Sequence, residues 1–237
     1  MRITLSWVAI AITLAFIGAS AVGCAARSHQ LALEQGELAL TLGDPEEAAD
    51  AFHRALEYKP RDPEALHGLA RSYIARADAE AALEIFAGLE HSEPAYFQSR
   101  ATPDYLLALL ASAETRLSRS DPRGGLRLAR RLRAIDPDYR GADHLFLRAL
   151  VAEGARLREA HRWRQAEKIY REALEFDASH VEAVLGLSEA LIGEGRVDEA
   201  IRMLSDASLQ HPEDARISAL MDRAIEIRYP ISPAKHS

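Results

Sequence analysis

A 34-residue period constrains this chain more than any other feature of its sequence. Two trios of small, large and small apolar residues lie 34 residues apart; they are Ala166, Tyr170 and Ala173, and then Ala200, Leu204 and Ala207. Offsets of four and three place each trio on one face of a helix. Another apolar run lies between the trios and ends in Gly193-Glu194-Gly195, which indicates a helix stop and a turn. The repeated unit is therefore a helix, a tight turn and a second helix.

The period extends towards the N-terminus. Two earlier trios are Ala48, Phe52 and Ala55, and then Ala82, Phe86 and Leu89. The residues that close successive units, spaced by 34, 43, 41 and 34, are Pro60, Pro94, Pro137, Ala178 and Pro212. Two units are thus longer at their front ends, by 9 and 7 residues. In the third unit the matching positions hold Gly125, Ala129 and Leu132, a weaker match.

A run of helical hairpins at this period, with small residues where helices must approach closely, resembles the tetratricopeptide repeat (TPR). The resemblance covers about five repeats, from Gln30 to Pro212. It implies an all-α fold, an α-solenoid of TPR-like helix-turn-helix repeats over residues 30–228. Residues 213–228 are predicted to form a C-terminal capping helix, because solenoids need a solubilising end. Its apolar positions are Ile217, Leu220, Met221, Ala224 and Ile225. We expect the tail, residues 229–237, to be disordered.

The first 23 residues differ in kind from the repeats. Met1-Arg2 gives a positive start, residues 3–22 are mostly apolar, and small residues precede Gly23-Cys24. This order is typical of a secretory signal. A single transmembrane anchor is the alternative, because 20 mostly apolar residues are long enough to span a bilayer.

Cys24 is the only cysteine of the chain, and it follows the apolar run directly. The segment resembles the lipobox of bacterial lipoproteins, in which the cysteine is lipidated and the signal is cleaved before it. The resemblance implies a signal peptide over 1–23, lipidation of Cys24, and a linker over 24–29 that keeps the first repeat close to the membrane. Ala25, where Asp would favour the inner membrane, implies the outer membrane facing the periplasm. An uncleaved anchor and a soluble secreted form are the alternatives.

Local signals predict where helices begin. We expect the first helix from about His29 to Leu42, with an apolar face that contains Leu31, Leu38 and Leu42. Acidic or hydroxyl residues before prolines predict N-caps; these residues are Asp44, Asp62, Thr102 and Asp121.

The nine-residue excess lies in residues 91–103, where two prolines bracket Tyr96 and Phe97. We interpret it as a loop or an extra turn whose aromatic residues fill the joint between repeats. An exposed aromatic contact for a partner is the alternative.

Charge is distributed unevenly. Residues 25–115 carry 7 basic and 16 acidic residues, residues 116–171 carry 15 and 7, and residues 172–237 carry 6 and 13. A segment of net charge +8 is thus flanked by segments of −9 and −7. Its predicted basic patch contains Arg123, Arg127, Arg130 and Arg131. We interpret these residues as a solvated face paired with acidic neighbours. A docking patch for an acidic protein, an anionic lipid or a polysaccharide is the alternative.

No motif indicates an enzyme. The nine histidines show no HExxH or CxxC-type spacing for zinc, and neither a GxSxG elbow nor a phosphate-binding glycine loop occurs. Acidic pairs such as Glu46-Glu47 lie at helix starts, where the helix dipole accounts for them. We therefore predict a protein that is not an enzyme and holds no cofactor or metal.

The family resemblance places a binding groove on one face of the first helices of the repeats. Carrying its positions onto this sequence gives Leu33, Glu37, His67, Arg71, Leu110, Glu114, Arg148, Arg158, Leu185 and Glu189. The Lys and Asn residues with which chaperone-binding TPR domains hold a C-terminal carboxylate are missing. The mixed lining suits an amphipathic peptide or helix.

Two functions follow as expectations. The first is a lipid-anchored periplasmic scaffold that binds a protein or peptide in its groove and assembles or localises an outer-membrane, pilus or secretion complex, as TPR pilotins do. The second is an envelope structural or carrier protein that binds an anionic polysaccharide or lipid through the Arg-rich middle. Nucleic acid is not an expected partner in this compartment.

Overall fold

The computed structural model describes residues 24–230, and every regular element within this range is helical. The elements are helix 24–42, α2 (Pro45–Tyr58), α3 (Pro63–Ala75), α4 (Ala79–Ser92), α5 (Pro94–Tyr96), the π-helix η1 (Phe97–Ala101), α6 (Thr102–Ser118), α7 (Pro122–Ile135), α8 (Ala142–Glu159), α9 (Trp163–Phe176), α10 (Val181–Gly193), α11 (Val197–Gln210) and α12 (Ala215–Arg228). This confirms the predicted all-α fold. The predicted signal peptide, residues 1–23, and most of the predicted tail lie outside the described residues.

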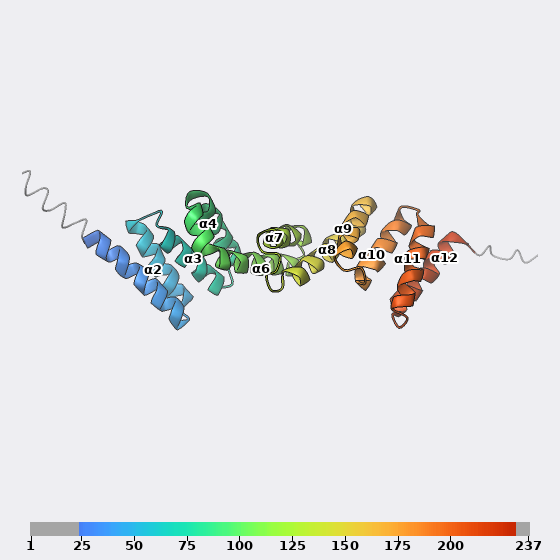
Figure 1. Ribbon diagram of the computed structural model, residues 1–237, viewed down its shortest axis with the longest axis horizontal. Coiled ribbons are helices and arrows are strands. Elements are labelled where there is room, and N and C mark those ends of the chain that lie inside the picture. Colours follow the sequence, from blue (N-terminus) through green and yellow to red (C-terminus); the bar gives the residue numbers. More distant parts are fainter. Residues whose placement is uncertain (1–23, 231–237) are drawn as a thin grey trace, which may run out of the picture. The chain divides into compact units, whose positions relative to one another are not determined.

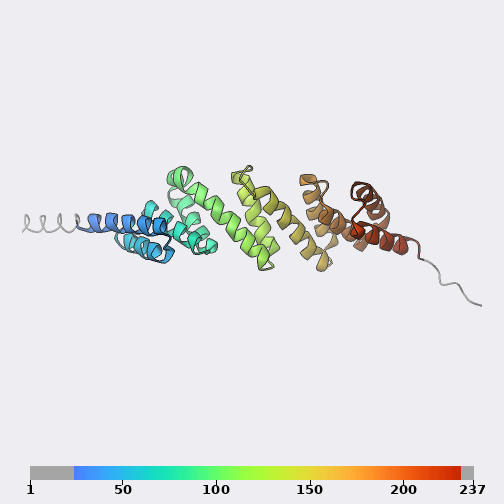
Figure 2. The ribbon, with the colours of Figure 1, turned by 90° about the horizontal axis from the view of Figure 1, so that it is seen from below.

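The chain divides into two compact units between Ala111 and Ser112, and α6 crosses this division. Within each unit, consecutive helices pack against each other (Figures 1 and 2). In unit 2, α8 also contacts α10, and α10 contacts α12. The first helix of one hairpin therefore contacts the first helix of the next, which is the stacking of an α-solenoid.

Aspartate caps begin several helices, as the sequence predicts. The Asp44 carboxylate accepts a hydrogen bond from the backbone N–H of Glu47 (3.1 Å), that of Asp62 from Ala65 (3.0 Å), and that of Asp121 from Gly124 (2.9 Å). In each case proline follows the aspartate, at a position where its missing N–H costs nothing. The caps satisfy N–H groups that have no partner inside their helices.

Large aromatic side chains of the second helices pack directly against glycines of the neighbouring first helices. We call each ring with its two glycines an aromatic-glycine lock. Phe52 of α2 is fully buried, and a Cβ atom added to Gly36 would lie 2.7 Å from its ring; one added to Gly68 of α3 would lie closer still. Tyr170 of α9 lies between Gly154 and Gly186 in the same way. No other residue type lets the helix backbone approach a ring this closely. The trios that define the sequence period are therefore core residues.

Of the two forms predicted for residues 91–103, the structure shows the extra turn and not the loop. The chain passes from α5 through η1 directly into α6. Pro103 has no N–H to donate to a helical hydrogen bond. In the turn before it, the N–H of Thr102 bonds the carbonyl of Phe97, five residues back, which is the hydrogen-bond pattern of a π-helix. The Thr102 hydroxyl also donates to this carbonyl (3.0 Å), so Thr102 is not the predicted N-cap.

The prediction that an aromatic residue fills this joint is confirmed for Phe97. Phe97 is buried and its ring packs edge-on against Phe86 and Tyr105, with centroid distances of 6.5 and 5.2 Å. Tyr96 instead reaches a polar network in unit 1, described below.

The first helix differs from its prediction at its start and in its buried face. Residues 24–28 are already helical, since Ala25 and Ala26 favour helix and nothing in this stretch breaks it. The predicted apolar residues Leu31, Leu38 and Leu42 are 54, 59 and 75% exposed. The core face contains Ala32, Leu33, Gly36 and Ala39 instead. Close packing against Phe52 selects small residues on this face, so the leucines lie on the opposite one.

The C-terminal helix α12 packs on α11 through Ile217, Leu220 and Ala224, all of them buried. This confirms most of the predicted apolar face. Ile225 is an exception, because it is 39% exposed.

Candidate functional site

A groove in unit 1 contains four of the predicted binding residues. It is a pocket of about 420 Å³ formed by helix 24–42, α3 and the segment around η1. Its lining residues are Gln30, Leu33, Glu34, Glu37, Phe52, Glu64, His67, Arg71, Tyr96 and Arg100. We call this pocket the unit 1 groove. It combines an apolar floor with charged groups of both signs on its walls.

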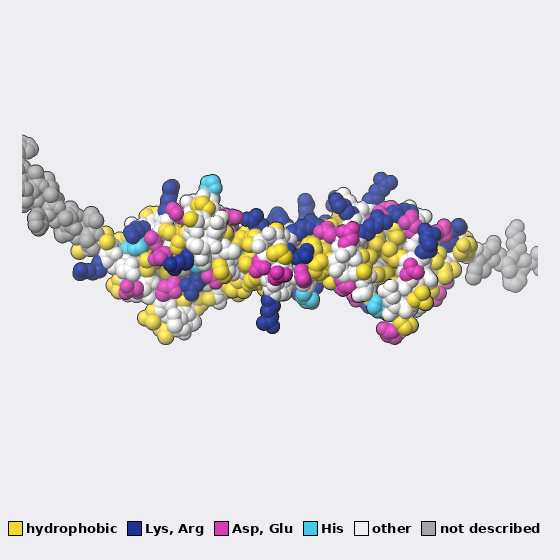
Figure 3. All heavy atoms as spheres, viewed as in Figure 1, with side chains coloured by type: hydrophobic (Ala, Val, Ile, Leu, Met, Phe, Trp, Pro, Cys, Tyr) yellow, Lys and Arg dark blue, Asp and Glu magenta, His cyan; other side chains and the backbone are white. Residues whose placement is uncertain are grey.

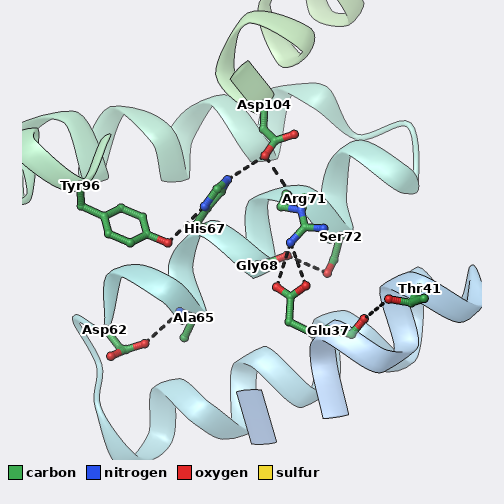
Figure 4. A network of polar contacts seen from close by, with 10 residues as sticks. All are labelled: Glu37, Thr41, Asp62, Ala65, His67, Gly68, Arg71, Ser72, Tyr96 and Asp104. Atoms are coloured by element: carbon green, nitrogen blue, oxygen red, sulfur yellow. Dashed lines mark hydrogen bonds and ion pairs between the residues drawn. The ribbon is translucent and has the colours of Figure 1, made fainter. Parts of the chain in front are cut away.

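Three side chains from three elements meet through His67 at one end of the unit 1 groove (Figure 4). Its Nε2 lies 2.8 Å from the Asp104 carboxylate, and its Nδ1 lies 3.2 Å from the Tyr96 hydroxyl. Because the carboxylate only accepts hydrogen bonds, Nε2 carries the proton. Burial, followed by the nearby charge of Glu64, raises the pKa of Tyr96. The network fixes the Tyr96 ring at the edge of the groove.

The adjacent pair in this network is Arg71 and Glu37. Nη1 of Arg71 lies 2.8 and 3.0 Å from the two carboxylate oxygens of Glu37, which joins α3 to helix 24–42 (Figure 4). Among the described residues, Arg100 and Glu64 form no ion pair. These two free charges, one of each sign, can bind groups on a ligand without first breaking an internal pair.

A second pocket brings together two more of the predicted residues, within unit 2. Arg158 of α8 forms an ion pair with Glu189 of α10. The pocket measures about 400 Å³, and Trp163, Leu220 and Arg223 also line it. Here too the charged residues at the predicted positions join neighbouring first helices, as Arg71 and Glu37 do in unit 1.

The other predicted groove residues line neither pocket. Leu185 packs against the hydrophobic cluster of α10, α11 and α12, so it is a core residue. Leu110 is half-buried on α6, whereas Glu114 of α6 and Arg148 of α8 are exposed. Their repeats are the lengthened ones, in which the spacing that placed these residues no longer holds.

Three of the predicted basic patch residues surround a hollow in unit 2. This hollow, which we call the basic pocket, measures about 610 Å³. Its charged lining residues are Arg116, Asp121, Arg123, Arg127, Arg130 and Glu153. Arg130 forms an ion pair with Glu172 (2.6 Å), and Arg116 with Asp121 (2.9 Å). Arg131 is exposed but does not line the pocket.

Much of the charge of the basic segment is paired internally. Arg133 bonds Asp143, Arg156 bonds Glu153 and Arg171 bonds Glu167. Figure 3 shows Lys and Arg side chains interspersed with Asp and Glu over unit 2. At the basic pocket, the described residues Arg123 and Arg127 have no ion-pair partner. The free positive charge there is therefore smaller than the sequence count implies.

Sequence patterns do not identify Arg100 and Asp104 as site residues, and they indicate mainly a packing role for the Tyr96 side chain. All three lie in or near the insertion that interrupts the period. The signal that could have identified them is the tyrosine itself, since its hydroxyl needs a polar partner when half-buried.

Neither a metal site nor a membrane span is found in the described part of the chain. Between residues 24 and 230, no three His, Cys, Asp or Glu residues are grouped so that they could hold a metal ion. In the same range, none of the helices combines the length and the apolar character needed to cross a bilayer.

Stacked helical hairpins with aromatic residues locked against glycines define a helical-repeat protein. A family model described as "Tetratricopeptide repeat" matches residues 39–113 and 157–224, more than half of the chain. The chain therefore belongs to the tetratricopeptide repeat family. The unmatched stretch between these ranges contains α7, the second helix of the third repeat, whose residues also match the period weakly.

Several solved structures are similar to this chain at low identity. A thermophilic TPR protein from Thermus thermophilus is 24% identical, with 83% of this chain and 98% of that chain covered and a TM-score of 0.36. Pseudomonas aeruginosa pilF is 16% identical, with 86% of each chain covered and a TM-score of 0.40. Yeast Tom70 is 16% identical, with 84% of this chain and 40% of that chain covered and a TM-score of 0.43. No curated protein matches the chain.

Proposed function

We propose that the protein is a lipid-anchored scaffold of the bacterial cell envelope that binds a peptide segment of a partner protein in the unit 1 groove. TPR domains bind protein or peptide partners. The observation that carries the proposal is the groove itself, which combines an apolar floor with the free charges of Arg100 and Glu64. The helix dipole favours an acid in the first turn of α3, where Glu64 lies, but no such effect accounts for Arg100, so binding is the better account of Arg100.

The lining of the groove indicates the chemistry of the peptide. Leu33, which lies over the fully buried Phe52 ring, gives the groove its small apolar floor, which suits one apolar side chain. Glu64 and Arg100 are placed to bind one basic and one acidic group. An amphipathic segment with a charge of each sign meets all of these contacts.

Photocrosslinking tests this groove in cells. A benzoylphenylalanine placed at Arg100 or Glu64 should crosslink one partner segment, whereas one at Arg61, exposed in unit 1 but outside the groove, should not. A synthetic peptide of the crosslinked segment should bind the protein, and Arg100→Glu should weaken this binding while the matched Arg61→Glu leaves it unchanged. Equal crosslinking from Arg61 and Arg100 would rule out the groove.

The envelope location is supported by the apolar run that ends in Gly23-Cys24. In this proposal the signal is cleaved and Cys24 is lipidated, so the scaffold stays at the membrane, most simply the outer membrane facing the periplasm. There it assembles or localises an outer-membrane, pilus or secretion complex. The wild type should incorporate labelled fatty acid and lose the mass of residues 1–23, and Cys24→Ser should do neither. Retention of residues 1–23 without label in the wild type would overturn the anchor.

The basic pocket of unit 2 supports a second candidate, the binding of an anionic polysaccharide. Arg123 and Arg127 are its free charges, and about 610 Å³ of space lies between them and the neighbouring helices. Binding through so few charges at the surface should weaken strongly as salt screens them. Arg123→Glu with Arg127→Glu should abolish it, whereas the matched pair Arg162→Glu with Arg164→Glu, exposed outside this pocket, should not.

A further inference from the structure

The exposed leucines of helix 24–42 have no partner within the described chain. Leu31, Leu38 and Leu42 are each more than half exposed, and the core face of this helix lies on its other side. Figure 3 shows hydrophobic atoms on the surface at the N-terminal end of unit 1. A stripe of this kind is unusual, because isolated exposed leucines are common but aligned ones mark an interaction surface.

Helix geometry places Cys24 on the same stripe. Residues 24, 31 and 38 are seven apart, and seven residues turn the helix by about 700°, only about 20° short of two full turns. Leu42 is four residues beyond Leu38, which returns it to the direction of Cys24 within the same arc. Because residues 24–42 form one unbroken helix, Cys24 and the three leucines point to the same side.

We infer that helix 24–42 lies flat on the lipid bilayer, with Leu31, Leu38 and Leu42 inserted beside the acyl chains carried by Cys24. The inference rests on the proposed lipidation. The stripe runs from residue 24 to residue 42, about 27 Å at about 1.5 Å per residue. Amphipathic helices bind in the interface plane through an exposed apolar side in this way, and the second apolar side of this helix is covered by the core of unit 1. The anchor thus sets the orientation of unit 1 as well as its position.

A second copy of the chain is a poorer occupant of this stripe. In a coiled coil, the leucines at positions 31 and 38 would alternate with residues 28 and 35 in the contact seam. These positions hold Ser28 and Gln35. A bilayer tolerates them, because polar residues beside the stripe can stay in the headgroup region. The nearest charged residues, Arg27 and Glu34, can do the same.

Depth-dependent quenching tests the inference. The lipidated protein is reconstituted into vesicles of phosphatidylethanolamine and phosphatidylglycerol that carry bromine on their acyl chains. Tryptophan introduced as Leu38→Trp should be quenched, whereas Glu84→Trp, exposed on α4, should not. Trp163, the native tryptophan that remains after residues 1–23 are removed, contributes the same background to both variants. Both substitutions are at exposed positions, and circular dichroism checks that both proteins are folded.

The leucines are tested separately from the lipid in a Cys24→Ser form of the mature chain that begins at residue 24 and therefore lacks both the acyl chains and the apolar residues 1–23. Its sedimentation with the same vesicles should fall by roughly tenfold or more when Leu31, Leu38 and Leu42 are changed to Gln. A matched triple change of exposed residues elsewhere, Leu107, Leu209 and Ile227 to Gln, should leave it unchanged.

The possible outcomes separate the two proposals. Fatty acid label without quenching in the Leu38→Trp variant overturns the flat helix and leaves the anchor standing. Quenching in that variant without fatty acid label overturns the anchor and supports the flat helix. Dimers in sedimentation velocity that disappear in the triple leucine variant assign the stripe to a second copy and overturn the inference.

Discussion

The buried side chain of Tyr170 packs between three helices of unit 2. It is 1% exposed, and its ring fills the space left by Gly154 and Gly186. Tyr170→Ala should therefore destabilise the protein by roughly 3–5 kcal/mol, as other truncations of large buried aromatic residues do. Urea denaturation followed by circular dichroism measures this change. A loss below about 1 kcal/mol, as for a surface substitution, would contradict the assignment of the repeats.

Ionisation of Tyr170 should lower the free energy of unfolding of unit 2 at high pH. Burial raises the pKa of Tyr170 to about 12 from its ordinary value of 10.0. The unfolded chain thus loses this proton first, and the contribution to stability is complete below pH 10 and is lost as the pH rises to about 12. Tyr170→Phe cannot titrate, so the free energy of unfolding should fall less over this window than in the wild type. Parallel pH profiles of the two proteins would contradict the shift.

At the scale of helices, glycines determine how closely neighbours approach. A methyl group on Gly186 would collide with the Tyr170 ring, whereas one on Gly88, exposed on α4, would meet nothing within 4 Å. Gly186→Ala should destabilise the protein by about 1–3 kcal/mol through overpacking. Gly88→Ala should stabilise it by up to about 1 kcal/mol, because alanine favours helix. Thermal denaturation of both variants should show opposite signs, and equal signs would contradict the close approach.

Helix α7 depends on its cap. The N–H of Gly124 and the Arg116 guanidinium bond the Asp121 carboxylate and hold its pKa below the ordinary value. This contribution is present above the unfolded pKa, near 4, and is lost as the pH falls through the folded one. Asp121→Ala should cost about 1 kcal/mol at neutral pH and flatten the acid side of the stability profile. Asp50→Ala, exposed on α2 and without an ion pair among the described residues, is the control and should leave the profile unchanged.

The elements show what could be predicted from the sequence and what could not. Phe52 and Tyr170 were identifiable as core residues because local spacing repeats at a constant period. The leucines of helix 24–42 were misassigned, since periodicity reveals an apolar side but not what covers it. His67 and Asp104 are 37 residues apart across an aperiodic insertion, so no pattern predicts their contact. Pairing of Arg71 with Glu37 and of Arg158 with Glu189 depends on side-chain reach, which spacing alone does not specify.

On the scale of the whole molecule, the break in the repeat pattern overlaps the basic segment. The family match breaks over residues 114–156, and the excess of basic residues covers residues 116–171. The lengthened repeats there are also the ones whose predicted groove residues Glu114 and Arg148 fail to line a pocket. Both pockets that contain predicted groove residues combine regular and lengthened repeats, since Tyr96 and Arg100 of the insertion line the unit 1 groove and Arg158 of α8 lines the other pocket.

The aromatic-glycine locks limit how this chain can be recombined. Phe52 contacts Gly36 from its own hairpin and Gly68 from the next, so each lock straddles the boundary between two repeats. A chimaera cut at that boundary would leave a glycine without its ring, or a ring facing a bulkier side chain. The transferable module therefore contains a second helix together with the first helices on both sides of it. Substitutions at the ring and at its two glycines should be accepted only together.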